Sequence, residues 1–106
     1  MVDLKQLQKE VIQNKINHGF NTTDVNEEFC YAFGELGEAH TAYIKKQDDV
    51  GEELADAMIY VLSIAEILGY DLEYELNRKI NINKTRVYKR NSRGVLVKLD
   101  ELNGEV

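Results

Sequence analysis

The sequence predicts an all-α fold of four helices, with an antiparallel helical hairpin as its core and a homo-oligomer that completes this core. Apolar residues recur at helical spacing in four segments, and the chain contains no proline to interrupt them. No segment before residue 90 shows the sustained alternation of apolar and polar residues that is typical of a strand. We therefore expect helices, and no strand, before that point.

The first two helices have recognisable ends. The first is expected over 3–18, with Gly19 as its stop and one apolar stripe formed by Leu4, Leu7, Val11 and Ile12. The second is expected to start at Asp24, which together with Glu27 is similar to a capping box, and to run to about Lys46.

The third and fourth helices follow without a long connection. Asp49 with Glu52 offers another start signal, and the third helix then runs to Leu68. Asp71 can cap the fourth helix, whose apolar residues recur at i,i+4, namely Leu72, Leu76 and Ile80. We expect one domain over 1–90 and a tail over 91–106, in which 94–97 forms either a short strand or a mobile segment.

The third helix is apolar on nearly all sides. Between Ala57 and Leu68 only Tyr60, Ser63 and Glu66 interrupt the apolar surface. Such a helix must be covered on most of its faces, and three short partner helices barely do this within one copy. The sequence therefore predicts a homodimer or a dimer of dimers, against the alternative of an exposed patch on a monomer.

Charge is distributed unevenly along the chain. The formal net charge is −6, which argues against a nucleic-acid polymer as the partner. Of the 19 acidic residues, 16 lie between Asp3 and Glu75, and a basic segment from Arg78 to Arg93 follows without any acid. This basic segment is either a solvated surface or a site that contacts the phosphates of a small anionic substrate.

Targeting signals and disulfides are not expected. No apolar run approaches the roughly 20 residues of a membrane span, and the first residues do not resemble a signal peptide. The single cysteine, Cys30, cannot form an internal disulfide. We expect no membrane partner and a cytoplasmic location.

Four carboxylates in two short steps are the main functional signal. Glu35 and Glu38 form one i,i+3 pair, and Glu53 and Asp56 form a second pair, so each pair shares a helix face. The 14 residues between Glu38 and Glu53 contain a short turn, so the two helices should run antiparallel and bring the pairs to similar heights. Clustered acids repel unless a cation lies between them, and Mg²⁺, or alternatively Mn²⁺, prefers oxygen ligands. The alternative is a set of ordinary surface acids.

These residues resemble the metal signature of the MazG-type all-α nucleoside triphosphate pyrophosphohydrolases. This group includes dimeric dUTPases, dCTP pyrophosphatases and phosphoribosyl-ATP pyrophosphohydrolases. The resemblance covers E-x-x-E followed by E-x-x-D, and it extends over three segments, 52–60 (EELADAMIY), 67–72 (ILGYDL) and 79–86 (KININKTR).

The resemblance implies a nucleotide pyrophosphohydrolase that cleaves a (d)NTP into (d)NMP and pyrophosphate and serves nucleotide-pool housekeeping. It implies that Glu35, Glu38, Glu53 and Asp56 are the catalytic metal ligands for Mg²⁺ or Mn²⁺. It also implies that the phosphate or sugar oxygens of the substrate are bound by Lys79, Asn83 and Arg86.

One departure from the family pattern concerns Gly34. Many relatives carry two adjacent acids at the first step, whereas here Gly34 precedes Glu35. A second metal ion or an auxiliary base is therefore in question, with Glu52 and Asp49 as candidate substitutes. A catalytically weak regulatory module that binds nucleotide and metal is the alternative function, and a purely structural helical oligomer is a third.

The residues that contact the base are less well defined. A base needs an apolar or aromatic platform, and the candidates are Phe20, Phe33, Tyr43 and Tyr60. Neither His18 nor His40 lies in the E-x-x-H spacing of a di-iron bundle, so that class is disfavoured. The preferred base and sugar are not predicted.

Overall fold

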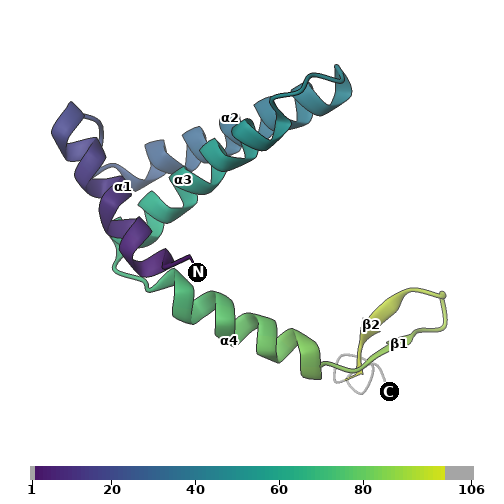
Figure 1. The fold of residues 1–106 in the computed structure, drawn as a ribbon. Coiled ribbons are helices and arrows are strands. Elements are labelled where there is room, and N and C mark those ends of the chain that lie inside the picture. Colours follow the sequence, from purple (N-terminus) through teal and green to yellow (C-terminus); the bar gives the residue numbers. More distant parts are fainter. Residues whose placement is uncertain (1, 100–106) are drawn as a thin grey trace. The chain divides into compact units, whose positions relative to one another are not determined.

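The computed structural model describes residues 2–99 of the chain (Figure 1). Its elements, in chain order, are α1 (Leu4–His18), α2 (Val25–Ile44), α3 (Val50–Leu68), α4 (Leu72–Thr85), β1 (Tyr88–Arg90) and β2 (Leu96–Lys98). The chain divides into two compact units between Glu73 and Tyr74. The prediction of a four-helix, all-α fold is confirmed for these residues, whereas a single chain does not test the predicted oligomer.

Local capping explains where the first helices begin and end. The Asp3 side chain accepts a hydrogen bond from the backbone N–H of Gln6 at 3.0 Å, which starts α1 as predicted. Asp24 does the same for Glu27 at 3.1 Å and starts α2. Gly19 ends α1 with φ at 75°, a left-handed conformation that glycine adopts without a Cβ clash.

The turn between α2 and α3 differs from the prediction in two details. The second helix ends at Ile44 rather than Lys46, because Lys46 adopts a positive φ of 56° that turns the chain. Asp49 precedes α3, but its side chain makes no capping hydrogen bond. Its φ of −99° and ψ of 15° lie outside the extended region from which an N-cap side chain reaches the helix.

The second unit contains a strand that the sequence did not predict. β1 pairs antiparallel with β2, with Lys89 opposite Val97, so the expectation of no strand before residue 90 was wrong. Three residues are too few to show alternation, and the pairing depends on a turn in which Asn91 Oδ1 accepts hydrogen bonds from Arg93 N and Val95 N. β2 forms a strand in the region expected to be either strand or mobile, and residues 100–106 of the predicted tail lie outside the described residues.

The first unit is built on the α2–α3 hairpin, whose two helices lie side by side in Figure 1. α1 packs against α3. The buried apolar positions are mostly small, which lets the backbones approach closely, and they comprise Ala39, Ala42, Ala57, Leu62, Ile64 and Ala65. Among the helices of the described part of the chain, none combines the length and apolar character needed to cross a bilayer.

Gln8 ties α1 to the segment that follows α3. Gln8 as a residue is only 2% exposed. The amide nitrogen donates to the Tyr70 carbonyl and the amide oxygen accepts from the Leu72 N–H, both at 2.8 Å. One buried amide therefore satisfies two backbone groups at the start of α4.

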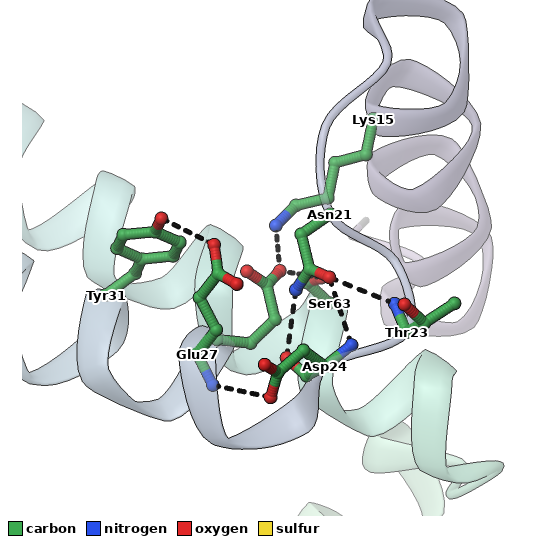
Figure 2. Close-up of polar contacts among 8 residues, drawn as sticks. Lys15, Asn21, Thr23, Asp24, Glu27, Tyr31 and Ser63 are labelled. Carbon is green, nitrogen blue, oxygen red and sulfur yellow. Dashed lines mark hydrogen bonds and ion pairs between the residues drawn. The ribbon is translucent and has the colours of Figure 1, made fainter.

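A buried ion pair joins three helices of the first unit (Figure 2). Lys15 of α1 pairs with Glu28 of α2, and Ser63 Oγ of α3 donates to the same Glu28 oxygen at 2.9 Å. Glu28 is 1% exposed and Lys15 is 7% exposed. The Lys15 ammonium also lies 4.5 Å from the centre of the Tyr60 ring, a cation–π contact.

This ion pair predicts an unequal effect of single and double substitutions. Lys15→Met should lower the free energy of unfolding by about 3–5 kcal/mol, because it leaves the Glu28 carboxylate buried without a countercharge. Lys15→Met combined with Glu28→Gln should recover more than half of this loss, because the amide keeps an acceptor for Ser63 without a charge. Urea unfolding of the unmodified protein, the single variant and the double variant measures both effects, and a double variant no more stable than Lys15→Met would contradict this explanation.

Candidate metal centre

The α2–α3 hairpin brings three of the four predicted acids together. Glu35 and Glu38 come from α2, and Glu53 comes from α3. One carboxylate oxygen of each residue can be chosen so that all three lie within 4.8 Å of one another. This is a spacing at which a single cation can contact several carboxylates.

Asp56 is one turn further along α3 and is not a member of this three-residue cluster. Together with Glu35, it lines a pocket that lies beside the cluster. Its negative charge contributes to the raised pKa values of Glu35 and Glu53, so it belongs to the same electrostatic environment.

Proximity of the acids is reflected in their protonation. Burial raises the pKa of Glu53 from 4.5 to about 7, with further contributions from a hydrogen bond with Glu38 and from the charges of Glu38, Glu35 and Asp56. Burial also raises the pKa of Glu35, followed by the charges of Glu38 and Asp56. The cluster is therefore costly to ionise without a positive charge nearby.

The donor set fits a hard divalent cation. Glu53 Oε2 is buried, and no hydrogen-bond partner satisfies it within the described part of the chain. A buried carboxylate oxygen without a partner is uncommon and is explained if it ligates an ion. All the available ligand atoms are carboxylate oxygens, which suit Mg²⁺ and Mn²⁺ and not soft metals.

Gly34 lies next to two of the clustered acids. It lines a hollow together with Glu38, Asp49 and Glu53. A Cβ added at Gly34 would meet nothing within 4 Å, so the position is open. Asp49 Oδ1 is a second buried oxygen without a partner among residues 2–99, which keeps Asp49 as a candidate substitute for the missing acid.

A pocket of about 730 Å³ opens beside the acids. Four parts of the chain form its walls: α1, the loop that follows α1, α2 and α3. The lining residues are, from α1, Leu7, Glu10, Val11, Asn14 and Lys15; from the loop, Gly19, Phe20 and Asn21; from α2, Glu27, Glu28, Tyr31 and Glu35; and from α3, Asp56, Ile59 and Tyr60. The loop is held by Asn21, whose side-chain oxygen accepts from Asp24 N at 3.0 Å and whose amide donates to the Asp24 carbonyl at 2.9 Å (Figure 2). The size suits a nucleotide base and sugar.

The four aromatic candidates for base contact separate into two groups. Phe20 and Tyr60 line this pocket. Phe33 and Tyr43 line a different, apolar hollow. Only the first pair is therefore available to a ligand that also reaches Glu35.

Sequence reasoning missed Lys15 and Glu28 on the pocket wall. A signal was present, because Lys15 continues the apolar stripe of α1 four residues after Val11. Likewise, Glu28 lies on the helix face that later carries Glu35 and Ala39. Two opposite charges on stripes that face the interior indicate a buried pair.

Three predicted phosphate ligands lie outside the first unit. Lys79 and Asn83 are exposed on α4, and Arg86 follows it and is partly exposed. All three belong to the second unit, whereas the four acids belong to the first. Their role therefore stays a prediction.

Comparison with known proteins assigns the family. The model of the MazG-like family matches residues 28–102, which is more than half of the chain and includes all four acids. The chain belongs to the MazG-like family. This confirms the resemblance seen in the sequence motifs, and no curated protein matches the chain.

A solved structure matches the MazG-like fold of this chain. It is the cyanophage S-2L MazG-like pyrophosphohydrolase bound to dGDP and three catalytic Mn²⁺ ions per active site. The TM-score is 0.64 at 22% sequence identity, and the match covers 93% of this chain and 99% of that one. At this identity the likeness shows the shared fold.

The raised pKa of Glu53 predicts how pH affects the metal-free protein. Between pH 4.5 and about 7 the folded protein holds a proton that the unfolded chain has lost. The stability from this proton is complete below pH 4.5 and is lost as the pH rises through 7. The thermal midpoint in EDTA should therefore decrease as the pH is raised from 5 to 7.5. Glu53→Gln should make this decrease smaller, because an amide does not ionise. Calorimetry across this range measures how steeply the thermal midpoint depends on pH, and Glu66→Gln on the same helix is the control. The same pH dependence in Glu53→Gln as in the unmodified protein would contradict the raised pKa of Glu53 as its cause.

Proposed function

We propose that this chain is a divalent-metal-dependent nucleoside triphosphate pyrophosphohydrolase, which cleaves a (d)NTP to (d)NMP and pyrophosphate. Mg²⁺ is the proposed physiological ion and Mn²⁺ a substitute for it. The observation that carries the proposal is the convergence of Glu35, Glu38 and Glu53, with an unpartnered buried oxygen on Glu53, beside a nucleotide-sized pocket. Action on free nucleotides in the cytoplasm, as pool housekeeping, is part of the proposal.

The residues of the hairpin suit this chemistry. Glu35, Glu38, Glu53 and Asp56 would hold the ion, and α2 and α3 keep them at fixed heights. A bound divalent cation supplies positive charge that neutralises phosphate oxygens and makes water more acidic. Glu35 and Asp56 line the pocket, so they would orient the phosphate end of a nucleotide that occupies it.

The ligand of the related structure supports this class of substrate. That cyanophage protein holds a deoxynucleoside diphosphate and Mn²⁺ ions in its active site. The shared fold makes a phosphorylated nucleotide the natural candidate ligand for this chain. Lys79, Asn83 and Arg86 remain the proposed ligands of phosphate or sugar oxygens, Arg86 with its planar guanidinium being best suited to phosphate.

The direct test is hydrolysis of a panel of standard and modified (d)NTPs with Mg²⁺, with Mn²⁺ and with EDTA. We expect metal-dependent release of pyrophosphate with one equivalent of monophosphate. Glu38→Gln should lower kcat/KM by about a hundredfold or more and abolish the rise in thermal midpoint caused by the metal, because a ligand to the ion is lost. Glu66→Gln, elsewhere on α3, should leave both unchanged. Release of inorganic phosphate in place of pyrophosphate would overturn the proposed bond cleavage.

Gly34 favours a second candidate, a regulatory module that binds nucleotide and metal but hydrolyses weakly. Its open position beside Glu38 and Glu53 lacks the acid that many relatives carry. Under this alternative, Mg²⁺ and nucleotide together stabilise the protein while the panel gives no pyrophosphate. Gly34→Glu should then raise the hydrolysis rate, since a side chain has room there.

We also propose a homodimer formed through the apolar face of the α2–α3 hairpin. On this face Phe33 is 70% exposed, Leu36 54% and Leu54 49%, although apolar side chains of this size usually seek cover. Met58 and Val61 continue the same surface along α3, where they line a hollow with Leu36 and Leu54. A second copy would cover this face, and paired hairpins would make a four-helix core.

The dimer proposal is tested by solution mass. Light scattering at micromolar concentration should give twice the chain mass for the unmodified protein. Met58→Lys should shift the mass toward one copy, because a charge is unfavourable at the centre of an apolar interface. Ile16→Lys is the matched control, since Ile16 is a similarly exposed apolar residue on α1. A monomer mass for the unmodified protein would refute the proposal.

A further inference from the structure

Lys15 is the only cationic residue among the described residues that line the 730 Å³ pocket. The same wall carries five acids, namely Glu10, Glu27, Glu28, Glu35 and Asp56. The Lys15 side chain is 9% exposed, so it is almost entirely enclosed by protein and still contributes to the pocket surface. A nearly buried charged side chain that lines a ligand pocket is a candidate contact for the ligand.

The ammonium is held in place and retains donor capacity. It pairs with Glu28, whose carboxylate is fixed in turn by Ser63, and it lies over the face of the Tyr60 ring. An ammonium has three N–H donors and no acceptor. The described contacts use one carboxylate and one ring face, which leaves a donor for a group in the pocket.

The partner of Lys15 indicates what kind of group this is. Because Glu28 neutralises the ammonium at contact distance, the pair has no net charge to attract a phosphate. Glu27 and Glu28 would also repel a phosphate placed at Lys15. A neutral acceptor, such as the exocyclic oxygen of a base, gains a charge-assisted hydrogen bond without this repulsion.

Aromatic surfaces suited to a base lie on the same pocket. Phe20 at its rim is 62% exposed and stacks on His18 with ring centroids 5.8 Å apart. Tyr31 and Tyr60 form a second aromatic pair, with centroids 5.5 Å apart. The pocket thus offers planar apolar contacts near Lys15 and carboxylates at Glu35.

We propose that Lys15 is a specificity-determining residue that donates a hydrogen bond to the exocyclic oxygen of a 6-oxopurine or 4-oxopyrimidine base. This inference rests on the proposed function, because it names the substrate class of the same site. Adenine and cytosine carry an amino donor at the matching position, and a donor cannot bond to an ammonium. Lys15 is held by its ion pair with Glu28, so moving it away to accommodate these bases would cost free energy.

The first test uses the unmodified protein and four purine deoxynucleoside triphosphates. dGTP and dITP share the 6-oxo group, dATP carries a 6-amino group, and the 2-aminopurine analogue carries only hydrogen there. We expect kcat/KM for dGTP and dITP to exceed that of the other two by at least about tenfold. Similar values for dGTP and the 2-aminopurine analogue, together with similar values for dUTP and dCTP, would overturn the assignment.

Binding separates failure of this inference from failure of the proposed function. Calorimetric titration of the same four nucleotides in Ca²⁺ reports base preference without requiring hydrolysis. Preference for the oxo bases with no pyrophosphate release would keep the Lys15 assignment and refute the hydrolase. Hydrolysis without base preference would keep the hydrolase and refute the Lys15 assignment. The absence of any nucleotide binding would refute both.

A variant then assigns the preference to this residue. Lys15→Met with Glu28→Gln removes the donor without leaving a buried charge, and circular dichroism checks that it folds. The dGTP to 2-aminopurine ratio of kcat/KM should fall toward one. An equal loss for every nucleotide would indicate a phosphate contact and overturn the assignment. Lys9→Met, which changes an exposed lysine on the same helix, is the matched control for loss of charge. The comparison of the nucleotides with the unmodified protein stands even if the double variant does not fold.

Discussion

The first unit depends on one buried carboxylate. Glu28 of α2 is bound by Lys15 of α1 and by Ser63 of α3, so three helices meet at a single side chain. Neither charge is favourable in the interior alone, and departure of α1 from the hairpin would therefore leave the Glu28 carboxylate without its countercharge. The same contact positions the wall of the pocket, which links the stability of the helix arrangement to the shape of the candidate site.

The acid cluster has the opposite physical character. Glu35, Glu38 and Glu53 repel one another, and the pKa of Glu53 is raised first by burial and then by its hydrogen bond with Glu38 and the neighbouring charges. The small side chains of the α2–α3 interface, such as Ala39, Ala42 and Ala57, pack closely enough to keep the hairpin intact despite this repulsion. A local conflict maintained by a well-packed scaffold is typical of a functional site, because the missing positive charge is supplied by a ligand.

Much of this could be predicted because it is local. Asp3, Asp24 and Gly19 act within one helical turn, and the i,i+3 spacing with a short connection was enough to bring α2 and α3 acids together. Contacts between non-adjacent helices were not predictable from periodicity. The pair of Lys15 with Glu28 depends on how α1 crosses the hairpin, and charged residues are usually solvated. β1 was missed because its pairing partner, not its own three residues, makes it a strand.

The position of the pocket wall in the sequence has a further consequence. The family model matches from residue 28 onward, whereas the α1 and loop residues of the pocket, from Leu7 to Asn21, all precede that point. The matched segment contains the four acids together with Tyr31 and Tyr60, and the segment before it supplies Lys15 and Phe20 to the same pocket. Under the proposed function, one nucleotide site therefore draws on both segments. Exchange of the first helix and its loop would then change part of the base-contacting surface while the four acids stay in place.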